Sequence, residues 1–169
     1  MNKKRVRNLV IALVILAALL IEPFWGSIKS AITGEDTETG ASPEVETVTC
    51  TIAISCQAVW GNTDMVEQDI LDLLPEDGWI LRETEMTVPD GTPVLQVLQW
   101  AADEVAGIPV VTSGTPAFVE RIGDLSNGDA GDVSGWTYTL NGESIMESAA
   151  VQTVTQDDEI VWAYVCTWD

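Results

Sequence analysis

The 169-residue sequence contains no histidine. This absence removes the most common general base of enzymes, the usual nitrogen ligand of zinc and any catalytic triad built on histidine. Basic residues are also scarce: beyond residue 30 only Arg82 and Arg121 stand against 26 acids, which leaves residues 31–169 with a formal charge of about −24. Because such a field repels phosphate backbones, we expect no nucleic-acid partner.

Other patterns for catalysis or metal binding are equally weak. The acidic loop 124–132 lacks the spacing of an EF-hand, and Ser134 follows no nucleophile elbow and has no histidine to activate it. Carboxylates at Glu143, Glu147 and residues 157–159 would serve glycoside cleavage only across a cleft, and nothing in the sequence places them so. We therefore expect a protein that is not an enzyme, with no catalytic residues and no metal.

The start of the chain is typical of an exported protein. Residues 1–7 are polar and basic, and thirteen apolar residues follow at Leu9–Ile21. A bilayer span needs roughly 20 apolar residues, and Pro23–Gly26 lengthens this run past one charge at Glu22. No small-x-small cleavage site follows. This favours an uncleaved signal anchor in residues 1–30 that crosses the membrane through residues 9–25, with cleavage and secretion as the alternative.

The remaining sequence divides into a linker and one domain. Basic residues near Met1 keep that end in the cytoplasm and place the rest of the chain outside. Residues 31–46 consist largely of Thr, Glu, Gly, Ser and Pro, which predicts an acidic disordered linker. Residues 47–169 are predicted to form a single domain, because about 120 residues suffice for one core and are too few for two.

Hydrophobic periodicity predicts strands around one main helix. Val48–Cys56 alternates strictly between apolar and polar residues, which indicates a half-buried strand. The apolar face of Val94–Ala106 predicts the best helix, with Thr92 as its N-cap, Pro93 at its first position and Gly107 behind it. This mixture of elements indicates an α+β fold.

The other elements are shorter. Asp64 and Glu67 have the spacing of a capping box and predict a short helix that Pro75 ends. Asn141–Gly142 is typical of a hairpin turn. Further strands are predicted at residues 83–88, 108–112, 117–122, 136–140 and 159–168, with a short extended piece at 151–154.

Several stretches together resemble one known family. They are Val94–Leu98 after Asp90-Gly91, Val119–Gly123, Ser134–Gly142 and the aromatic terminal strand Ile160–Tyr164. In order and spacing they are similar to the transcobalamin-like C-terminal domain, which is common on bacterial surface proteins. That family is related to the small β-rich domain of the cobalamin carriers transcobalamin and intrinsic factor. The resemblance covers residues 47–168.

The resemblance implies both an architecture and a binding surface. It implies a small β-rich domain with one main helix packed on a sheet, whose first and last strands are parallel neighbours. It also implies a ligand-binding surface on the sheet face and the adjoining loops. The residues of this surface are Trp136, Tyr138, Asn141, Gly142 and Ile145.

Cobalamin is a candidate ligand through this resemblance alone. In the carriers, an aromatic-Pro pair, a glycine, a tyrosine and an Asp-Gly turn face cobalamin. Their places are taken here by Ser144-Ile145, Ser148, Gln152 and Gln156-Asp157. We therefore rank a cell-surface protein or wall partner first, ahead of a glycan or a cobalamin-like ligand. A structural spacer without a small-molecule ligand is the alternative.

Seven tryptophans are many for a chain of this length. One interpretation is that they fill the core of a domain with little Leu or Phe. The other is a partly exposed aromatic platform for a planar or sugar-like ligand.

Three cysteines in an exported chain suggest one disulfide and one thiol. Cys50 and Cys56 are six residues apart on one strand, or roughly 20 Å, whereas a disulfide tolerates about 7 Å between Cα atoms. One of them must therefore join Cys166 if a bond forms. The parallel terminal strands that the resemblance implies favour Cys56–Cys166, with Cys50 as a buried thiol; an antiparallel pairing would favour Cys50.

Overall fold

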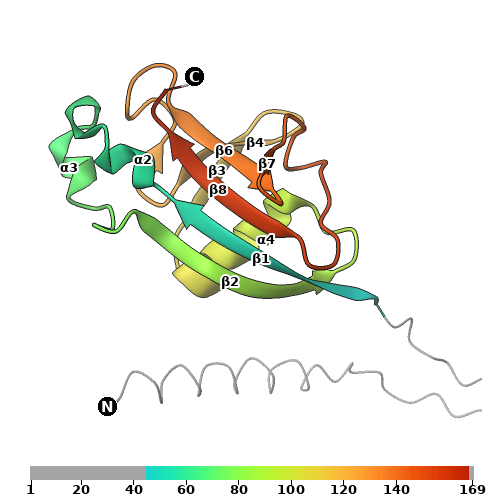
Figure 1. Ribbon diagram of the computed structural model, residues 1–169. Helices are drawn as coiled ribbons and strands as arrows, with labels where there is room; N and C mark the ends of the chain where they lie inside the picture. Colours follow the sequence, from blue (N-terminus) through green and yellow to red (C-terminus); the bar gives the residue numbers. More distant parts are fainter. Residues whose placement is uncertain (1–44, 168–169) are drawn as a thin grey trace, which may run out of the picture. The chain divides into compact units, whose positions relative to one another are not determined.

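The computed structural model describes residues 45–167 (Figure 1). The predicted signal anchor in residues 1–30, its apolar run and nearly all of the linker lie outside the described residues, as does Trp168. Within residues 45–167, no helix combines the length and the apolar character that crossing a membrane requires.

The main sheet has five strands in the order β2-β1-β8-β6-β7. The terminal strands β1 (Thr47–Ser55) and β8 (Glu159–Val165) are parallel neighbours, with Ile52 opposite Ile160. This confirms the parallel arrangement expected from the resemblance, and with it the α+β class. The other strands pair antiparallel with their neighbours; they are β2 (Trp79–Pro89), β6 (Gly135–Leu140) and β7 (Glu143–Ser144).

A smaller sheet and several short helices complete the domain. The strands β3 (Val110–Ser113), β4 (Phe118–Ile122) and β5 (Leu125–Ser126) form a three-stranded antiparallel sheet. The chain between β1 and β2 forms α2 (Gln57–Trp60), the 3₁₀ helix η1 (Thr63–Met65) and α3 (Gln68–Leu71).

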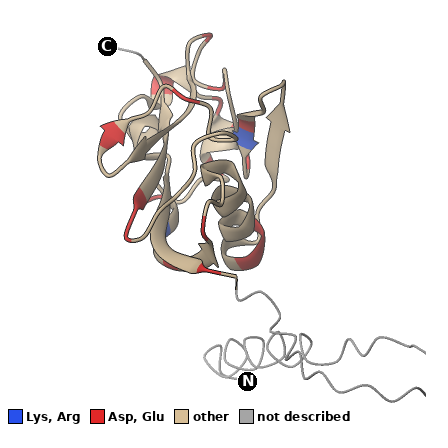
Figure 2. Cartoon of the chain, turned by 90° about the vertical axis from the view of Figure 1, so that its right-hand side faces the viewer, with Lys and Arg blue, Asp and Glu red and all other residues tan. Residues whose placement is uncertain are grey.

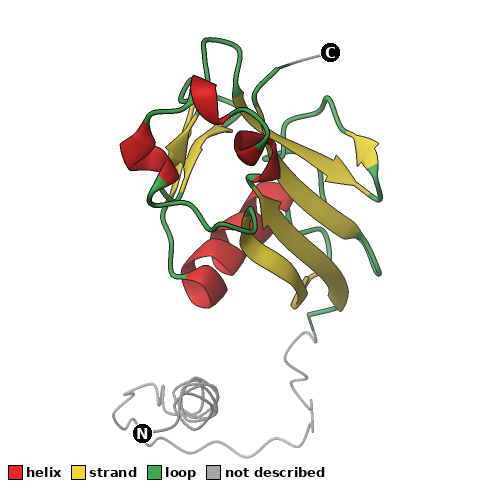
Figure 3. Cartoon of the chain, turned by 60° about the vertical axis from the view of Figure 1, so that its left-hand side comes forward, coloured by secondary structure: helices red, strands yellow, loops and turns green. Residues whose placement is uncertain are grey.

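The core lies between the five-stranded sheet and the main helix α4 (Val94–Trp100), which crosses behind the strands (Figures 1 and 3). Because side chains alternate along a strand, β1 and β8 each turn one row inward. Ile52, Ile160 and Leu98 are completely buried in this core. Burying each such side chain stabilises the fold by roughly 1.5–3 kcal/mol.

The main helix differs from its prediction at both ends. Pro93 is the N-cap, and the Thr92 hydroxyl donates to the carbonyl oxygen of Pro89 (2.6 Å) rather than capping the helix. After Trp100 the chain continues as the π-helix η2 (Ala101–Ala106), which Gly107 closes in the left-handed conformation as expected. A π-helix has wider turns, so its buried face shifts, and Val105 is 49% exposed instead of buried.

The predicted capping box is wrong. Asp64 lies inside η1, Glu67 precedes α3, and neither helix has a side-chain hydrogen bond at its N-cap. Val66 between them is extended, with φ −120° and ψ 137°. The extended residue interrupts the single helix that the box requires, because a box needs its two residues on one continuous first turn.

The predicted Cys56–Cys166 disulfide is not formed, since all three cysteines are free and buried. The register of β1 and β8 sets Ser55 opposite Ala163. β1 ends at Ser55 and β8 ends at Val165, so Cys56 directly follows the residue paired with Ala163, whereas Cys166 lies three residues beyond Ala163. The parallel strands therefore bring both cysteines to the same end of the sheet without setting them opposite each other.

We expect these thiols to react only after unfolding. Burial raises the pKa of Cys50 and Cys166, and raises that of Cys56 from 9.0 to about 11. The thiolate is the reactive form of cysteine. A thiol reagent at pH 8 is therefore expected to label almost no cysteine rapidly in the folded chain, and to label all three after denaturation. Above pH 9 the thiols of the unfolded chain lose their protons, whereas the buried thiols of the folded chain keep theirs. The free energy of unfolding should therefore fall as pH rises from about 9 to 11. If only one thiol reacts in denaturant, the other two cysteines form a disulfide, which would contradict the structure.

Candidate functional site

Two aromatic pairs connect β6 and β8 on the inner face of the sheet. Cross-strand register sets Trp136 opposite Tyr164 and Tyr138 opposite Trp162. The first pair is edge-to-face with ring centroids 5.3 Å apart, and the second is tilted with centroids 5.2 Å apart. Each aromatic pair of this kind stabilises the fold by roughly 0.5–1.5 kcal/mol, in addition to the contribution of the apolar area that it buries. The two pairs fix the position of the rings from which a hollow beside β6 is built.

This hollow has a volume of about 380 Å³ and is called the aromatic hollow below. It opens beside β6, between the start of β4 and the loop that follows β7. Its walls include Trp136, Tyr138, Trp162 and Phe118 together with residues 145–149.

Most polar atoms of the aromatic wall are already satisfied. The indole N–H of Trp136 donates to the carbonyl oxygen of Leu125 (2.9 Å), and the Tyr138 hydroxyl donates to that of Glu147 (2.8 Å). Among the described residues, the indole Nε1 of Trp162 is the buried side-chain polar atom with no partner. The aromatic side chains of the wall therefore offer a ligand mainly ring surface, and the polar residues Asn127, Glu147 and Ser148 complete the lining.

The rim of the aromatic hollow is apolar and faces solvent. Phe118 is 53% exposed and Met146 is 98% exposed, and Ile145 in the same lining is half-buried. Burying such side chains is favourable at about 25 cal/mol per Å² of apolar area. Exposed apolar side chains beside a preformed hollow mark a contact surface.

Three of the five residues predicted for the site line this hollow, namely Trp136, Tyr138 and Ile145. Asn141 and Gly142 do not; they form the turn between β6 and β7, with φ angles of 54° and 77°. The Asn141 amide donates to the Asp158 carboxylate (2.8 Å), and its oxygen accepts from the backbone N–H of Glu159 (2.9 Å). Asn141 thus joins two loops. Phe118 and Met146, which no sequence motif marks, lie at the rim instead.

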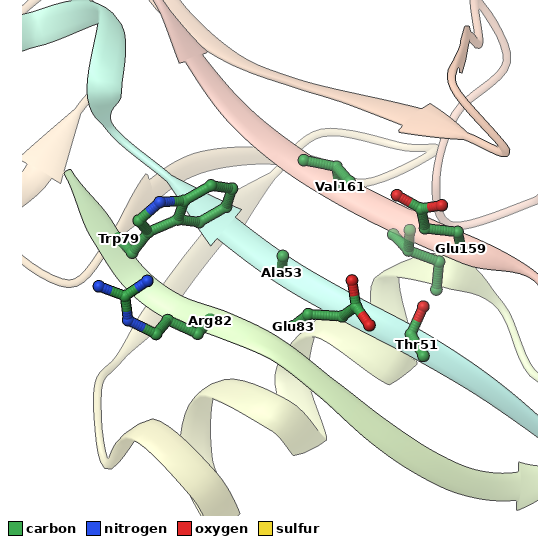
Figure 4. Close-up of a pocket in the computed structure, with 8 residues that line it drawn as sticks. Thr51, Ala53, Trp79, Arg82, Glu83, Glu159 and Val161 are labelled. Carbon is green, nitrogen blue, oxygen red and sulfur yellow. The ribbon is translucent and has the colours of Figure 1, made fainter. Parts of the chain in front are cut away.

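A second hollow of about 300 Å³ lies on the opposite, outward face of the sheet, across β2, β1 and β8 (Figure 4). It is called the outer-face hollow below. The lining comprises Thr51, Ala53, Trp79, Arg82, Glu83, Glu159, Ile160 and Val161. The alternation of β1 identified Thr51 and Ala53 as outward residues, but the neighbours that β2 and β8 supply depend on register, which the sequence pattern does not give.

Comparison with known proteins identifies the fold. A model of the family described as a domain of unknown function, DUF4430, matches residues 91–165. A solved structure of haptocorrin in complex with Cbi is similar to this chain with a TM-score of 0.52 and 13% identity. The fold is transcobalamin-like. The match covers 75% of this chain but 27% of haptocorrin, so this chain spans about a quarter of that protein.

The other comparisons add little to this. A solved structure from Ruminococcus gnavus ATCC 29149, described as a candidate metal binding protein, has 12% identity and a TM-score of 0.41. The match covers 72% of this chain and 99% of that one, but a likeness at this score carries no argument. No curated protein matches the sequence.

Charge on the transcobalamin-like domain is almost entirely negative (Figure 2). Within residues 45–167, Arg82 and Arg121 are the basic residues, and Arg82 forms an ion pair with Asp77. The described part of the chain contains no group of three side chains suited to holding a metal ion. Burial, and to a lesser extent the Glu147 carboxylate, raises the pKa of Tyr138, so its hydroxyl remains a donor at physiological pH.

Proposed function

We propose that the transcobalamin-like domain is a non-enzymatic binding module displayed outside the cytoplasm, and that the aromatic hollow holds its ligand. The observation that carries this proposal is the apolar rim, where Met146 is 98% exposed and Phe118 is 53% exposed beside a hollow walled by aromatic rings. Leaving these side chains in water is unfavourable unless a partner covers them. The alternative is a spacer domain without a ligand.

A segment of a cell-surface protein suits this hollow best. Trp136 and Tyr138 already use their polar atoms in hydrogen bonds within the domain. Among the described residues that line the hollow, the buried polar side-chain atom without a partner is Nε1 of Trp162. A glycan needs many hydrogen bonds in its site, whereas an apolar side chain of a protein gains from contact area alone. We therefore place a protein partner ahead of a glycan.

Site-specific photocrosslinking in the cell that displays the chain tests this function. A photoreactive phenylalanine analogue at position 146 is expected to give a discrete adduct. The same analogue at Leu73, which is 62% exposed and outside the hollow, should give none. With the captured partner purified, the F118S/M146S variant is expected to bind at least tenfold more weakly, because two buried apolar contacts are lost. The matched L73S/V105S variant should bind normally. Equal labelling at both positions, or none, would favour the spacer.

Cobalamin is expected to bind weakly or not at all. The solved haptocorrin structure is a complex with Cbi, but the match covers 27% of that protein. In this chain Ser144-Ile145, Ser148 and Gln152 stand where the resembling family has an aromatic-Pro pair, a glycine and a tyrosine. Calorimetric titration of the full-length chain is expected to show no dissociation constant below about 1 μM, equivalent to −8.2 kcal/mol. Tighter binding would make cobalamin the ligand of the aromatic hollow.

We also propose that the chain is tethered to the membrane through residues 9–25, with the domain outside. The support is the basic start, the apolar run and the lack of a small-x-small site after it. Full-length protein should fractionate with membranes and resist extraction by high salt. A mature form in the medium that begins near residues 26–35 would instead establish cleavage and secretion.

A further inference from the structure

The outer-face hollow has an apolar floor and chemically distinct ends. Ala53 forms the floor on β1, where its small side chain lets the side chains of β2 and β8 stand above it. Cross-strand register sets Trp79 opposite Ser55 and Glu159 opposite Thr51. These positions are four residues apart on β1, or roughly 13 Å. Figure 4 shows the Trp79 indole at one end and the carboxylates of Glu83 and Glu159 toward the other.

The polar groups at the carboxylate end are free to bind a ligand. Within the described part of the chain, the side chains of Thr51, Glu83 and Glu159 form no hydrogen bond or ion pair, whereas Arg82 is held by Asp77. Figure 4 shows the Arg82 guanidinium turned away from both glutamates. The hollow therefore presents hydrogen-bond acceptors and two uncompensated negative charges.

These features select the class of ligand. An anion is repelled by the two carboxylates and by the acidic domain around them. A neutral sugar can donate hydrogen bonds to the carboxylates, but it leaves both negative charges uncompensated. A protonated amine on an aliphatic chain complements the two carboxylates, the apolar floor and the Trp79 ring. Its ammonium group binds between Glu83 and Glu159, its methylene groups lie over Ala53 and Val161, and the Trp79 ring covers the far end of the apolar stem.

We propose that the outer-face hollow binds a primary alkylammonium group, such as a lysine side chain of a partner polypeptide or a free diamine. This site is on the opposite face of the sheet from the aromatic hollow and does not depend on the function proposed for that hollow. It lets the domain engage a basic ligand and an apolar one on separate faces.

Two-dimensional NMR of the full-length chain in non-ionic detergent tests this proposal. The probes are acetyl-Gly-Gly-Lys-Gly-Gly-amide, the same peptide with Nε-acetyllysine, and 1,5-diaminopentane. The lysine peptide is expected to shift the Trp79 indole signal and to bind with a dissociation constant of about 1 mM in 20 mM salt. The acetylated peptide should not bind. Binding of the diamine with equal affinity would assign the site to free amines, and binding of the peptide alone would assign it to a polypeptide.

Matched variants separate this site from general attraction to an acidic protein. E83Q/E159Q is expected to weaken binding of the lysine peptide at least tenfold, and W79A about fivefold. E104Q/E143Q removes the same charge at two exposed positions outside the hollow and should change binding less than twofold. All four glutamates are exposed, so circular dichroism melts should confirm that the variants remain folded. Equal weakening by both double variants, or equal binding of the acetylated peptide, would overturn the proposal.

Discussion

Gly78→Ala is expected to lower the melting temperature of the domain by roughly 10–20 °C, corresponding to about 3 kcal/mol or more. Gly78 has a φ of +72°, and a Cβ at this position would lie 2.6 Å from Cγ and 2.8 Å from Cα of Gln57. The left-handed conformation costs an alanine about 1–2 kcal/mol, and the overlap adds a further 1–3 kcal/mol. The backbone has little room to move, because the Gly78 carbonyl accepts a hydrogen bond from the N–H of Cys56 (2.8 Å).

Gly91→Ala is the matched control for this prediction. Gly91 has a similar φ of +76°, but nothing lies within 4 Å of the Cβ that alanine would add. Gly91→Ala should therefore lower the free energy of unfolding only by the conformational cost of about 1–2 kcal/mol. Thermal and guanidinium unfolding of both variants, followed by circular dichroism, measures the difference. If the two variants lose equal stability, Gln57 moves aside and the overlap is relieved.

Asp158→Ala is expected to destabilise the domain by about 3 kcal/mol. Asp158 is 7% exposed, and its carboxylate accepts from the backbone N–H of Thr155 (2.7 Å), from the Thr155 hydroxyl (3.1 Å) and from the Asn141 amide (2.8 Å). Removing it deletes three hydrogen bonds to a charged group, each of which contributes about 1.5–3 kcal/mol, and water replaces part of this loss because Thr155 and Asn141 are exposed. The backbone of Asp158 also holds the N–H of Thr51 (2.8 Å), so the loop is tied to β1 as well.

A double-mutant cycle checks the cause. Asn141→Gly removes the amide and keeps a residue that tolerates the φ of 54° at this position. In the D158A background it should cost at least about 1 kcal/mol less than in the native chain, because the two side chains bond each other. Asp124→Ala removes one charge from an exposed position and should change stability by less than about 0.5 kcal/mol. Additive losses for D158A and N141G would show that the amide–carboxylate bond contributes nothing.

Patterns that are local in the sequence predicted the elements best. The alternation of Val48–Cys56 gave β1, with Ile52 inside and Thr51 outside, because a strand has a fixed period of two. Asn141–Gly142 gave the turn, because few residue pairs tolerate two positive φ angles. The capping box failed because its signal depends on one continuous helical turn, and Val66 is extended in the folded chain.

The sites required information that a single sequence lacks. Resemblance to a family led to Trp136, Tyr138 and Ile145, which line one hollow. Phe118 comes from a strand of the smaller sheet, and its position at the same hollow depends on how the two sheets pack. The outer-face hollow combines β1 with two strands that are distant from it in sequence, so only the register reveals it.

The parallel pairing of β1 with β8 also determines how the domain responds to mechanical force. The N-terminal end of β1 and the C-terminal end of β8 lie at opposite ends of this strand pair, because the two strands run in the same direction. A pull applied between the ends of the domain therefore slides one strand lengthwise along the other. In this shear geometry the hydrogen bonds between the strands share the load instead of opening one after another. Since β1 is also bonded to β2 on its other side, withdrawing β1 alone from the sheet breaks two ladders at once.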